Sequence, residues 1–343
     1  MIRIKIDIVG GGFGGLCTAI TIKRLDKTIQ VTVHEKHNQI GYNPEGRRCA
    51  EGYNVYPALQ EWGPPRNCIF NVIKKCEYII GNTVHDLPIN RFASSPMTID
   101  RQGFLAHLGK KAEELGVDLQ TRDKITSVSD LKGAYIVDAS GCPSTIRKDL
   151  GRTQGRNAKS YQQTIENCNV FLADTVRFIF KNSMGYYWIF PRDPAKKEIN
   201  LGVGILGNFT GNSKELLASF KKEWGIQGDV NYTTGGLIPV GLQKPLTYKN
   251  IIFVGDAGVG TFPITGEGVP RAILSGEIAG KCIVSGHVHH YPSLIKRQFL
   301  KWDIAGKTCL TAGNILQRIG RNAYETSLNS FFRLFFIPKY YKQ

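Results

Sequence analysis

The sequence predicts a mixed α/β protein in which a parallel sheet is interrupted by an antiparallel, β-rich insertion and followed by a helical C-terminus. Three observations indicate this fold class. A strand–helix–strand pattern opens the chain, a buried strand followed by a helix comes late, and alternating strands fill residues 160–206 between them. Parallel strands need a crossover helix, whereas alternating polarity is typical of antiparallel strands. At about 150 residues per domain, the 343 residues suggest two structural units.

The N-terminal part of the chain forms one strand–helix–strand unit. Residues 4–10 are typical of a buried strand, residues 14–25 of a helix, and residues 30–35 of a second strand. A helical crossover joins parallel neighbours in a sheet, so we expect these two strands to pair in parallel.

A glycine motif lies where the first strand ends and the helix begins. Gly10, Gly12 and Gly15 form a GxGxxG pattern that also includes Gly14. The first glycine permits a tight turn, the second lets the backbone approach a pyrophosphate, and the third lets helix and strand pack closely. Free N–H groups at the helix start attract the phosphates. Glu35 ends the second strand, where a carboxylate binds a ribose hydroxyl. The motif therefore predicts a Rossmann-like domain that binds FAD or NAD.

The remaining elements follow from periodicity and from cap residues. Residues 36–58 are expected to form a loop. Helices are expected over 99–115, 213–224 and 267–285, and strands over 117–119, 134–137, 176–180, 186–190, 199–205 and 251–254. The last fifty or so residues are predicted to be helical.

A second glycine-rich segment decides between the two dinucleotides. Gly255 and Asp256 end a late buried strand, and Gly266, Gly268 and Val269 follow at a helix start. A carboxylate at the end of a strand can bind a ribityl hydroxyl, and the N–H groups of a helix start can face a flavin ring. The sequence therefore predicts FAD as the cofactor.

At these residues the chain resembles the FAD-dependent oxidoreductases that are built like aromatic-ring hydroxylases. In that family a Gly-Asp motif after the last sheet strand binds the ribityl chain of the flavin. The resemblance implies the same role for Gly255-Asp256. The segment from Asp138 to Arg147 resembles the family's Asp-Gly motif, although Ala139 and Ser140 separate Asp138 from its glycine. Arg101 matches the family's flavin-contacting arginine.

Three further segments resemble geranylgeranyl reductases. These are Arg48-Cys49-Ala50-Glu51, the aromatic stretch 185–191 and the glycine-rich stretch 235–241. The resemblance implies a reductase that saturates double bonds in the geranylgeranyl chains of membrane lipids or their precursors. It also implies that Arg48 and Cys49 contact the flavin.

Saturating an isolated double bond requires a hydride, which a reduced flavin carries, and a proton. Candidates for the proton donor are Cys49, Glu51 and the tyrosine pair Tyr186 and Tyr187. Strand periodicity places Tyr186, Trp188 and Phe190 on one face, which could line a groove for a long apolar substrate or form an ordinary sheet core. No second GxGxxG motif occurs, so the expected electron donor is a transiently bound NAD(P)H or an electron carrier.

Two other functions fit the same motifs. One is a flavin monooxygenase or halogenase of small aromatics, and the other is a flavin electron-transfer protein that docks to a membrane. The basic charge is compatible with nucleic acid, but no nucleic-acid-binding motif supports that partner. No cysteine pair or His/Cys spacing fits zinc, so no metal is expected.

The motifs divide the chain into three parts. Residues 1–58, 98–155 and 245–290 are assigned to a discontinuous FAD-binding domain, residues 59–97 and 156–244 to a substrate-binding domain, and residues 291–343 to a basic and aromatic C-terminal segment.

The charge indicates an anionic partner. The net charge is +16, and residues 291–343 hold nine Lys or Arg and two Asp or Glu. Aromatic residues among basic ones, as in the stretch 330–338, suit a membrane interface, and a helix docked on the protein body is the alternative. There is neither an apolar run of about 18 residues nor a signal-peptide pattern. We therefore expect a cytoplasmic protein that binds an anionic membrane surface peripherally.

Overall fold

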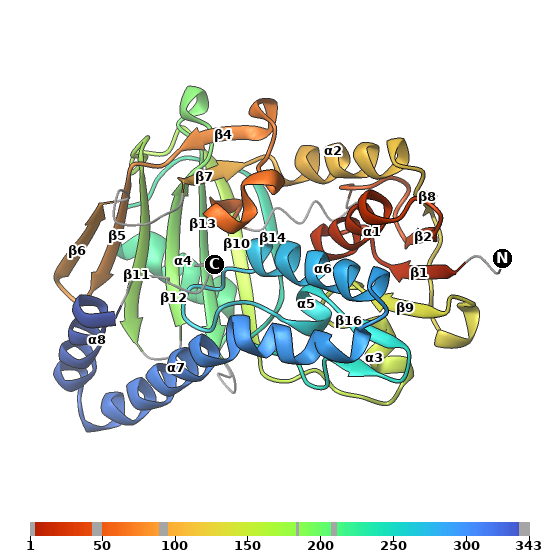
Figure 1. The fold of residues 1–343 in the computed structure, drawn as a ribbon. Coiled ribbons are helices and arrows are strands. Elements are labelled where there is room, and N and C mark those ends of the chain that lie inside the picture. Colours follow the sequence, from red (N-terminus) through yellow and green to blue (C-terminus); the bar gives the residue numbers. More distant parts are fainter. Residues whose placement is uncertain (1–3, 43–49, 89–94, 183–184, 207–210, 336–343) are drawn as a thin grey trace. The chain divides into compact units, whose positions relative to one another are not determined.

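The computed structural model describes residues 4–42, 50–88, 95–182, 185–206 and 211–335 (Figure 1). The chain divides into two compact units. Unit 1 comprises Met1–Gly46, Arg101–Asn157 and Ile238–Ile304, and unit 2 comprises Arg47–Asp100, Ala158–Leu237 and Ala305–Gln343.

Unit 1 is built on a six-stranded sheet with the order β15-β16-β9-β1-β2-β8. The strands are β1 (Lys5–Val9), β2 (Gln30–Glu35), β8 (Asp118–Thr121), β9 (Tyr135–Asp138), β15 (Thr247–Tyr248) and β16 (Ile251–Phe253). They pair in parallel except for β15 and β16. Ile6 and Ile8 of β1 are fully buried, as expected for a strand covered on both faces.

Helices complete unit 1, and small residues let two of them pack closely. The helices are α1 (Phe13–Leu25), α2 (Arg101–Glu114), α3 (Thr145–Asp149), α5 (Gly255–Gly258), α6 (Val269–Val284) and the first half of α7 (Tyr291–Ile319). A Cβ atom on Gly276 of α6 would lie only 2.3 Å from the carbonyl oxygen of Gly14 in α1. The backbone of α6 therefore lies against the start of α1, next to the glycine motif.

Unit 2 contains a seven-stranded sheet with the order β14-β10-β13-β12-β11-β5-β6 and a three-stranded sheet with the order β3-β7-β4. The strands are β3 (Gly52–Val55), β4 (Ile69–Val72), β5 (Lys75–Ile80), β6 (Thr83–Pro88), β7 (Ser95–Ile99), β10 (Asn157–Glu166), β11 (Thr175–Asn182), β12 (Gly185–Pro191), β13 (Ile199–Leu206) and β14 (Asp229–Pro239). Strands β10 to β13 pair in antiparallel fashion. The helices of this unit are α4 (Ser213–Glu223), α8 (Arg321–Phe335) and the second half of α7.

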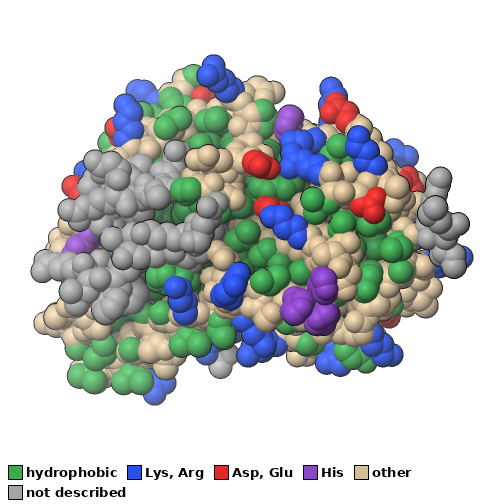
Figure 2. All heavy atoms as spheres, viewed as in Figure 1, with side chains coloured by type: hydrophobic (Ala, Val, Ile, Leu, Met, Phe, Trp, Pro, Cys, Tyr) green, Lys and Arg blue, Asp and Glu red, His purple; other side chains and the backbone are tan. Residues whose placement is uncertain are grey.

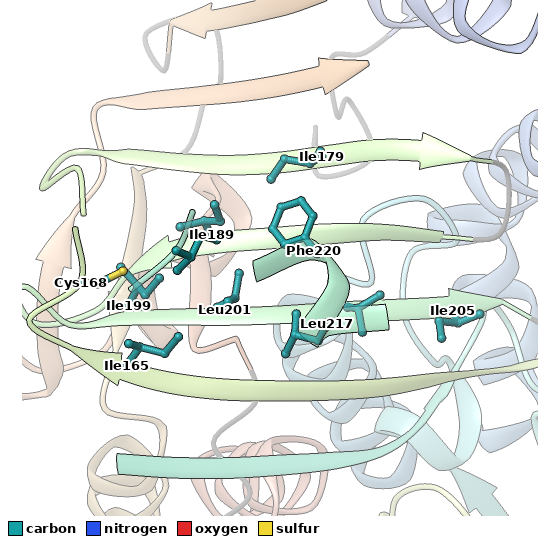
Figure 3. Packing of buried hydrophobic residues seen from close by; sticks show 11 residues of the cluster. Ile165, Cys168, Ile179, Ile189, Ile199, Leu201, Ile205, Leu217 and Phe220 are labelled. Atoms are coloured by element: carbon teal, nitrogen blue, oxygen red, sulfur yellow. The ribbon is translucent and has the colours of Figure 1, made fainter. Parts of the chain in front are cut away.

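Helix α4 covers one face of the large sheet, and the side chains between the helix and the sheet form a hydrophobic core (Figure 3). Leu217 and Phe220 of α4 are almost completely buried against Ile189 of β12 and Leu201 of β13. Asn212 caps the helix by accepting a hydrogen bond from the Lys214 backbone.

The prediction of a loop over residues 36–58 was wrong at its end, because Gly52–Val55 forms strand β3. This strand is short and pairs with β7, about forty residues later, so tertiary pairing rather than a local pattern determines it. Short 3-10 helices lie at Pro57–Trp62, Arg66–Cys68, Val128–Asp130, Pro194–Lys196 and Val288–His290.

Two kinds of feature are absent from the described residues. No helix among them is both long and apolar enough to cross a membrane. No group of three or more His, Cys, Asp or Glu side chains in the same part of the chain is arranged to hold a metal ion.

Candidate functional site

The glycine loop between β1 and α1 has one open position and two packed ones. Gly10 has a φ of +106°, and a Cβ atom there would lie 2.4 Å from the Ala139 carbonyl oxygen. A Cβ atom on Gly15 would lie 2.1 Å from the Gly10 carbonyl oxygen. Around Gly12, the N-cap of α1, no atom lies within 4 Å of such a Cβ. The open side of Gly12 fits a phosphate that approaches the helix start.

The Glu35 carboxylate is fixed at the end of β2, beside this loop. One of its oxygens accepts a hydrogen bond from the Gly11 N–H at 2.8 Å. The other accepts one from the His37 N–H at 3.0 Å and lies 2.6 Å from His37 Nδ1. A carboxylate offers about four acceptor positions, so a ribose hydroxyl can still bind.

The second glycine segment presents a carboxylate. Gly255, with a φ of +55°, donates its N–H to the Ser275 hydroxyl at 3.0 Å and starts α5. Burial raises the pKa of the neighbouring Asp256, and the charges of Arg101 and Arg271 oppose that shift. The Asp256 side chain is half-buried, so its carboxylate can accept a hydrogen bond from a bound hydroxyl.

Two buried charges hold the backbone that follows Asp256. Arg271 of α6 is fully buried and forms a bidentate ion pair with Asp303 of α7, at 2.8 and 3.1 Å. It also donates to the carbonyl oxygens of Val259 at 2.7 Å and Gly260 at 3.1 Å. Asp303 in turn accepts the Leu242 N–H at 2.7 Å. This pair therefore fixes the course of residues 258–261.

A second buried arginine, Arg147, holds the neighbouring backbone. Arg147 donates to the carbonyl oxygen of Ala257 at 2.7 Å and to that of Gln243 at 2.9 Å, and its guanidinium lies 4.0 Å from the Phe253 ring centroid. The Gln154 side chain donates to the Asp256 carbonyl oxygen at 3.0 Å. The carbonyl groups of Asp256 and Ala257 thus accept hydrogen bonds from the protein itself.

Asp138, the first residue of the segment that resembles the Asp-Gly motif, has a structural role. The buried Asp138 carboxylate accepts hydrogen bonds from the Ser140 N–H at 3.0 Å, the Ser140 hydroxyl at 2.6 Å and the Ser144 hydroxyl at 2.5 Å. Ser144 caps α3. Asp138 therefore stabilises the turn after β9.

The other residues predicted to contact the flavin lie at helix starts of unit 1. Arg101 begins α2, and its guanidinium lies 5.9 Å from the Phe13 ring centroid. Gly266 has a φ of +70°, Gly268 is the N-cap of α6 without a side-chain cap, and Val269 begins that helix. Gly268 and Val269 therefore present backbone N–H groups at the start of α6, whereas the Gly266 N–H is donated to the Phe262 carbonyl oxygen at 2.9 Å.

The motif around Glu51 belongs to unit 2. The Glu51 carboxylate is buried, accepts a hydrogen bond from Arg192 Nε at 2.6 Å and another from Asn200 Nδ2 at 3.0 Å. Arg192 also pairs with Glu198. Burial alone would lower the pKa of Arg192, but the two carboxylates outweigh it and raise that pKa. Both contacts have a Glu51 carboxylate oxygen as acceptor, so the geometry favours a structural role for Glu51 over proton donation.

The ion pair links two segments that resemble geranylgeranyl reductases, because Glu51 follows the Arg-Cys-Ala stretch and Arg192 follows the aromatic stretch. Arg48 and Cys49 themselves lie outside the described residues. Their assignment to the flavin, and that of Cys49 to proton donation, stay predictions.

The aromatic strand β12 divides its side chains between two faces. Tyr187 stacks on Phe220 of α4, with ring centroids 4.2 Å apart, and burial raises the pKa of its phenol. Tyr186, Trp188 and Phe190 lie on the opposite face. Tyr187 therefore packs in the core under α4, and its predicted role as proton donor to a substrate on the other face disagrees with this geometry.

The face that carries Trp188 is an aromatic layer. Tyr186 and Phe190 lie 5.6 and 5.1 Å from Phe178 of β11, measured between ring centroids. Trp188 donates its indole N–H to the Gln162 side chain at 3.2 Å. The indole crosses Gly202 of β13, where a Cβ atom would lie 2.1 Å from it. The position of this ring thus depends on the glycine beneath it.

Sequence reasoning missed Arg271, Asp303 and Arg192 as residues that position the site, and it singled out Arg147 only as the end of the segment that resembles the Asp-Gly motif. Arg271 had a signal, because it is the one charged residue in the first half of an otherwise apolar helix that follows a glycine-rich start. Such an arginine is either buried with a partner or exposed, and the partner, Asp303, lies on a different helix. The sequence shows no pairing between them.

Comparison with known proteins supports the expected fold and resemblance. A family model described as an NAD(P)-binding Rossmann-like domain matches residues 8–60. The chain is 29% identical to digeranylgeranylglycerophospholipid reductase of Methanocella arvoryzae, over 82% of this chain and 79% of the relative. It is 26% identical to digeranylgeranylglycerophospholipid reductase 1 of Methanococcoides burtonii, over 83% of this chain and 76% of the relative.

Two solved structures share the fold. A geranylgeranyl bacteriochlorophyll reductase-like protein from Thermoplasma acidophilum has a TM-score of 0.82 and 20% identity, covering 98% of this chain and 97% of its own. The flavin-dependent halogenase CmlS has a TM-score of 0.70 and 15% identity, covering 95% of this chain and 68% of its own. The predicted mixed α/β fold with a Rossmann-like domain is confirmed, and so is the resemblance to geranylgeranyl reductases.

Proposed function

We propose that this protein is an FAD-dependent reductase that saturates double bonds in the geranylgeranyl chains of membrane lipids or their precursors. The observation that carries this proposal is its similarity, over most of the chain, to proteins named digeranylgeranylglycerophospholipid reductase. The glycine loop, Glu35 and the Gly255-Asp256 segment support it, since their geometry suits a flavin dinucleotide.

The residues of unit 1 would hold FAD. Gly12 and the N-terminus of α1 would receive the pyrophosphate, Glu35 the adenosine ribose, and Asp256 the ribityl chain. When bound and reduced, the flavin supplies the hydride for an alkene carbon. Arg271 and Arg147 keep the Asp256 backbone fixed, so the ribityl contact is in place before the cofactor arrives.

The residues of unit 2 would hold the prenyl chain and supply the proton. In the aromatic layer, Tyr186 is half-buried and could contact an isoprenoid, whereas Trp188 and Phe190 are buried and support it from within the sheet. Because Glu51 is paired with Arg192 and Tyr187 packs under α4, Cys49 and Tyr186 are the candidates that we retain as proton donor, and the variant below tests Cys49. An external donor, either NAD(P)H or an electron carrier, would reduce the flavin.

Anaerobic reduction of a geranylgeranylated glycerophospholipid by dithionite tests the function. We expect mass spectrometry to show one added pair of hydrogens for each saturated bond, only when protein and FAD are both present. Cys49→Ser should retain FAD and lose most turnover, whereas Cys309→Ser, at a half-buried cysteine of α7, should not.

The same preparation separates the alternatives. Oxygen consumption with hydroxylation or halogenation of a small aromatic would replace the proposal by the monooxygenase or halogenase function, which the fold of CmlS permits. Reduction of a quinone or carrier protein, with the prenyl lipid unchanged, would instead identify an electron-transfer protein.

A substitution at Asp256 tests the cofactor assignment. We expect Asp256→Ala to raise the FAD dissociation constant about tenfold, since a lost buried hydrogen bond costs about 1–3 kcal/mol. Asp138→Ala should mainly lower the thermal midpoint, because Asp138 bonds to Ser140 and Ser144 of its own turn. Fluorescence titration of the apoprotein measures both constants. Equal constants for the two variants would contradict the assignment of Asp256.

A further inference from the structure

The last turns of α7 expose two isoleucines to solvent. Ile315 is 56% exposed and Ile319 is 72% exposed, the latter the highest exposure among the large apolar residues that the structure describes. They are four positions apart on one helix, so they share a face. Ala312, one turn earlier on this face, is also exposed. Figure 2 shows hydrophobic side chains at the surface where α7 ends, beside the start of α8.

Basic residues accompany this apolar face, and two acidic residues, Glu325 and Glu223, act on one of them, Arg321. From Ala305 to Tyr324 the sequence holds Lys307, Arg318 and Arg321 and no Asp or Glu. Arg318 is exposed, and Arg321, whose side chain is 71% exposed, pairs with Glu325 of the same helix at 2.6 Å. This pair lies in solvent, where it only partly offsets the positive charge. We call Ala312, Ile315, Arg318, Ile319 and Arg321 the α7 end patch.

We propose that the α7 end patch docks the protein on anionic lipid bilayers. Exposed isoleucines need an apolar medium, and the arginines beside them need negative charge, which together fit the interface of an acidic membrane. A nucleic acid would satisfy the arginines and leave the isoleucines in water. The inference rests on the proposed function in one respect, namely that a substrate with long prenyl chains resides in the bilayer.

The patch differs from the segment that the sequence pattern singled out. That pattern favoured the aromatic stretch around residues 330–338, whose side chains from residue 331 onward lie outside the described residues. On α8 the described Tyr324 and Leu328 are buried, so this part of the helix turns its apolar residues inward. The exposed apolar face with basic neighbours is on α7 instead.

Co-sedimentation with vesicles tests the docking. The full-length protein is mixed with phosphatidylcholine vesicles that contain or lack phosphatidylglycerol, at low and high salt. We expect binding to the anionic vesicles, and a loss of at least about tenfold in the partition coefficient for the double variant Ile315→Glu with Ile319→Glu. Salt should weaken wild-type binding without abolishing it, because screening acts on the arginines and not on the isoleucines.

The matched control carries the same two charges elsewhere in unit 2. Leu172 and Val230 are 45% and 44% exposed, so Leu172→Glu with Val230→Glu changes charge and exposed apolar surface similarly. It should bind vesicles within about twofold of wild type. Equal losses in both double variants would overturn the proposal, as would wild-type protein that stays in the supernatant with anionic vesicles at low salt. A change in oligomeric state by light scattering, with vesicle binding intact, would assign the patch to a second copy of the chain and likewise overturn it.

The reductase assay separates this inference from the proposed function. With a detergent-solubilised prenyl lipid, the α7 variant should turn over like wild type, and with the same lipid in vesicles it should be impaired. If wild-type protein reduces neither form but binds vesicles through the patch, the function fails and the docking stands. If the variant reduces both forms of the lipid at wild-type rates, the reaction does not need docking through the α7 end patch, which would contradict the proposal.

Discussion

Replacing Arg271 by methionine is expected to lower the free energy of unfolding by about 3–5 kcal/mol, because it leaves the Asp303 carboxylate buried without its partner. Arg271 is fully buried, and both of its ion-pair contacts are to Asp303. Since a whole domain is stable by only about 5–15 kcal/mol, this is a large fraction of the total. Urea denaturation with wild type as reference measures it.

The loss should affect the cofactor as well as the fold. Arg271 also donates to the carbonyl oxygens of Val259 and Gly260, which follow Asp256. We expect Arg271→Lys, which keeps the charge but cannot form the same bidentate contacts, to fold and yet bind FAD about tenfold more weakly. The double variant Arg271→Met with Asp303→Leu should recover much of the stability, because an apolar pair avoids desolvation, but not the FAD affinity.

Lys281→Met in the same helix is the control. Lys281 pairs with Glu277 at the surface, where its side chain is 60% exposed, so the change should cost less than about 1 kcal/mol. A folded Arg271→Lys protein with wild-type FAD affinity would show that the ion pair stabilises the unit without positioning the Asp256 backbone.

The sequence predicted the elements whose pattern is local. The first strand, the helix α1 and the strand β2 were expected within a residue or two of Lys5–Val9, Phe13–Leu25 and Gln30–Glu35. In these elements the glycine motif and the apolar runs belong to one short stretch of chain. The helix over 267–285 likewise corresponds to α6 (Val269–Val284).

Elements that depend on distant partners were not predicted. Strand β14 (Asp229–Pro239) is largely exposed and contains two glycines, so neither alternation nor hydrophobicity marks it. It forms a strand because it lies at the edge of the sheet, beside β10. The two backbones are so close that a Cβ atom on Gly235 would lie 2.7 Å from the Ser160 carbonyl oxygen. An edge strand of this kind is identified from the strand that it pairs with, not from its own sequence.

The candidate site shows the same division. Glycines and Glu35 could be found from spacing, because spacing along one strand and one helix determines where they lie. The role of Glu51 could not, since its partner Arg192 is 141 positions later. The side-chain alternation of β12 was predicted correctly. Which face of β12 packs on α4 depends on Phe220, which the sequence pattern does not place. Tyr187 stacks on Phe220 and therefore lies on the face opposite Tyr186, Trp188 and Phe190.

The second large effect is expected at the glycine loop. There, substitution of Gly15 should lower the stability of the apoprotein, whereas substitution of Gly12 should weaken FAD binding. We expect Gly15→Ala to destabilise the apoprotein by about 1–3 kcal/mol or more, because overpacking forces the backbone apart. Its Cβ would lie 2.1 Å from the Gly10 carbonyl oxygen and 3.2 Å from Ile8 Cγ2. Helix α1 must then move away from β1, and FAD binding should be lost with it. Thermal unfolding of the apoprotein measures the first effect.

Gly12→Ala should leave the apoprotein's stability within about 1 kcal/mol of wild type, because nothing lies within 4 Å of the added Cβ. Gly12 has a φ of −82°, which alanine adopts without strain. The new methyl group would instead occupy the space through which a pyrophosphate approaches the start of α1, so FAD should bind about 100-fold more weakly, or about 2.7 kcal/mol. Gly236→Ala in β14, where an added Cβ also meets no atom within 4 Å, is the control, and its FAD affinity should not change. Wild-type FAD affinity in Gly12→Ala would mean that the dinucleotide does not approach this loop.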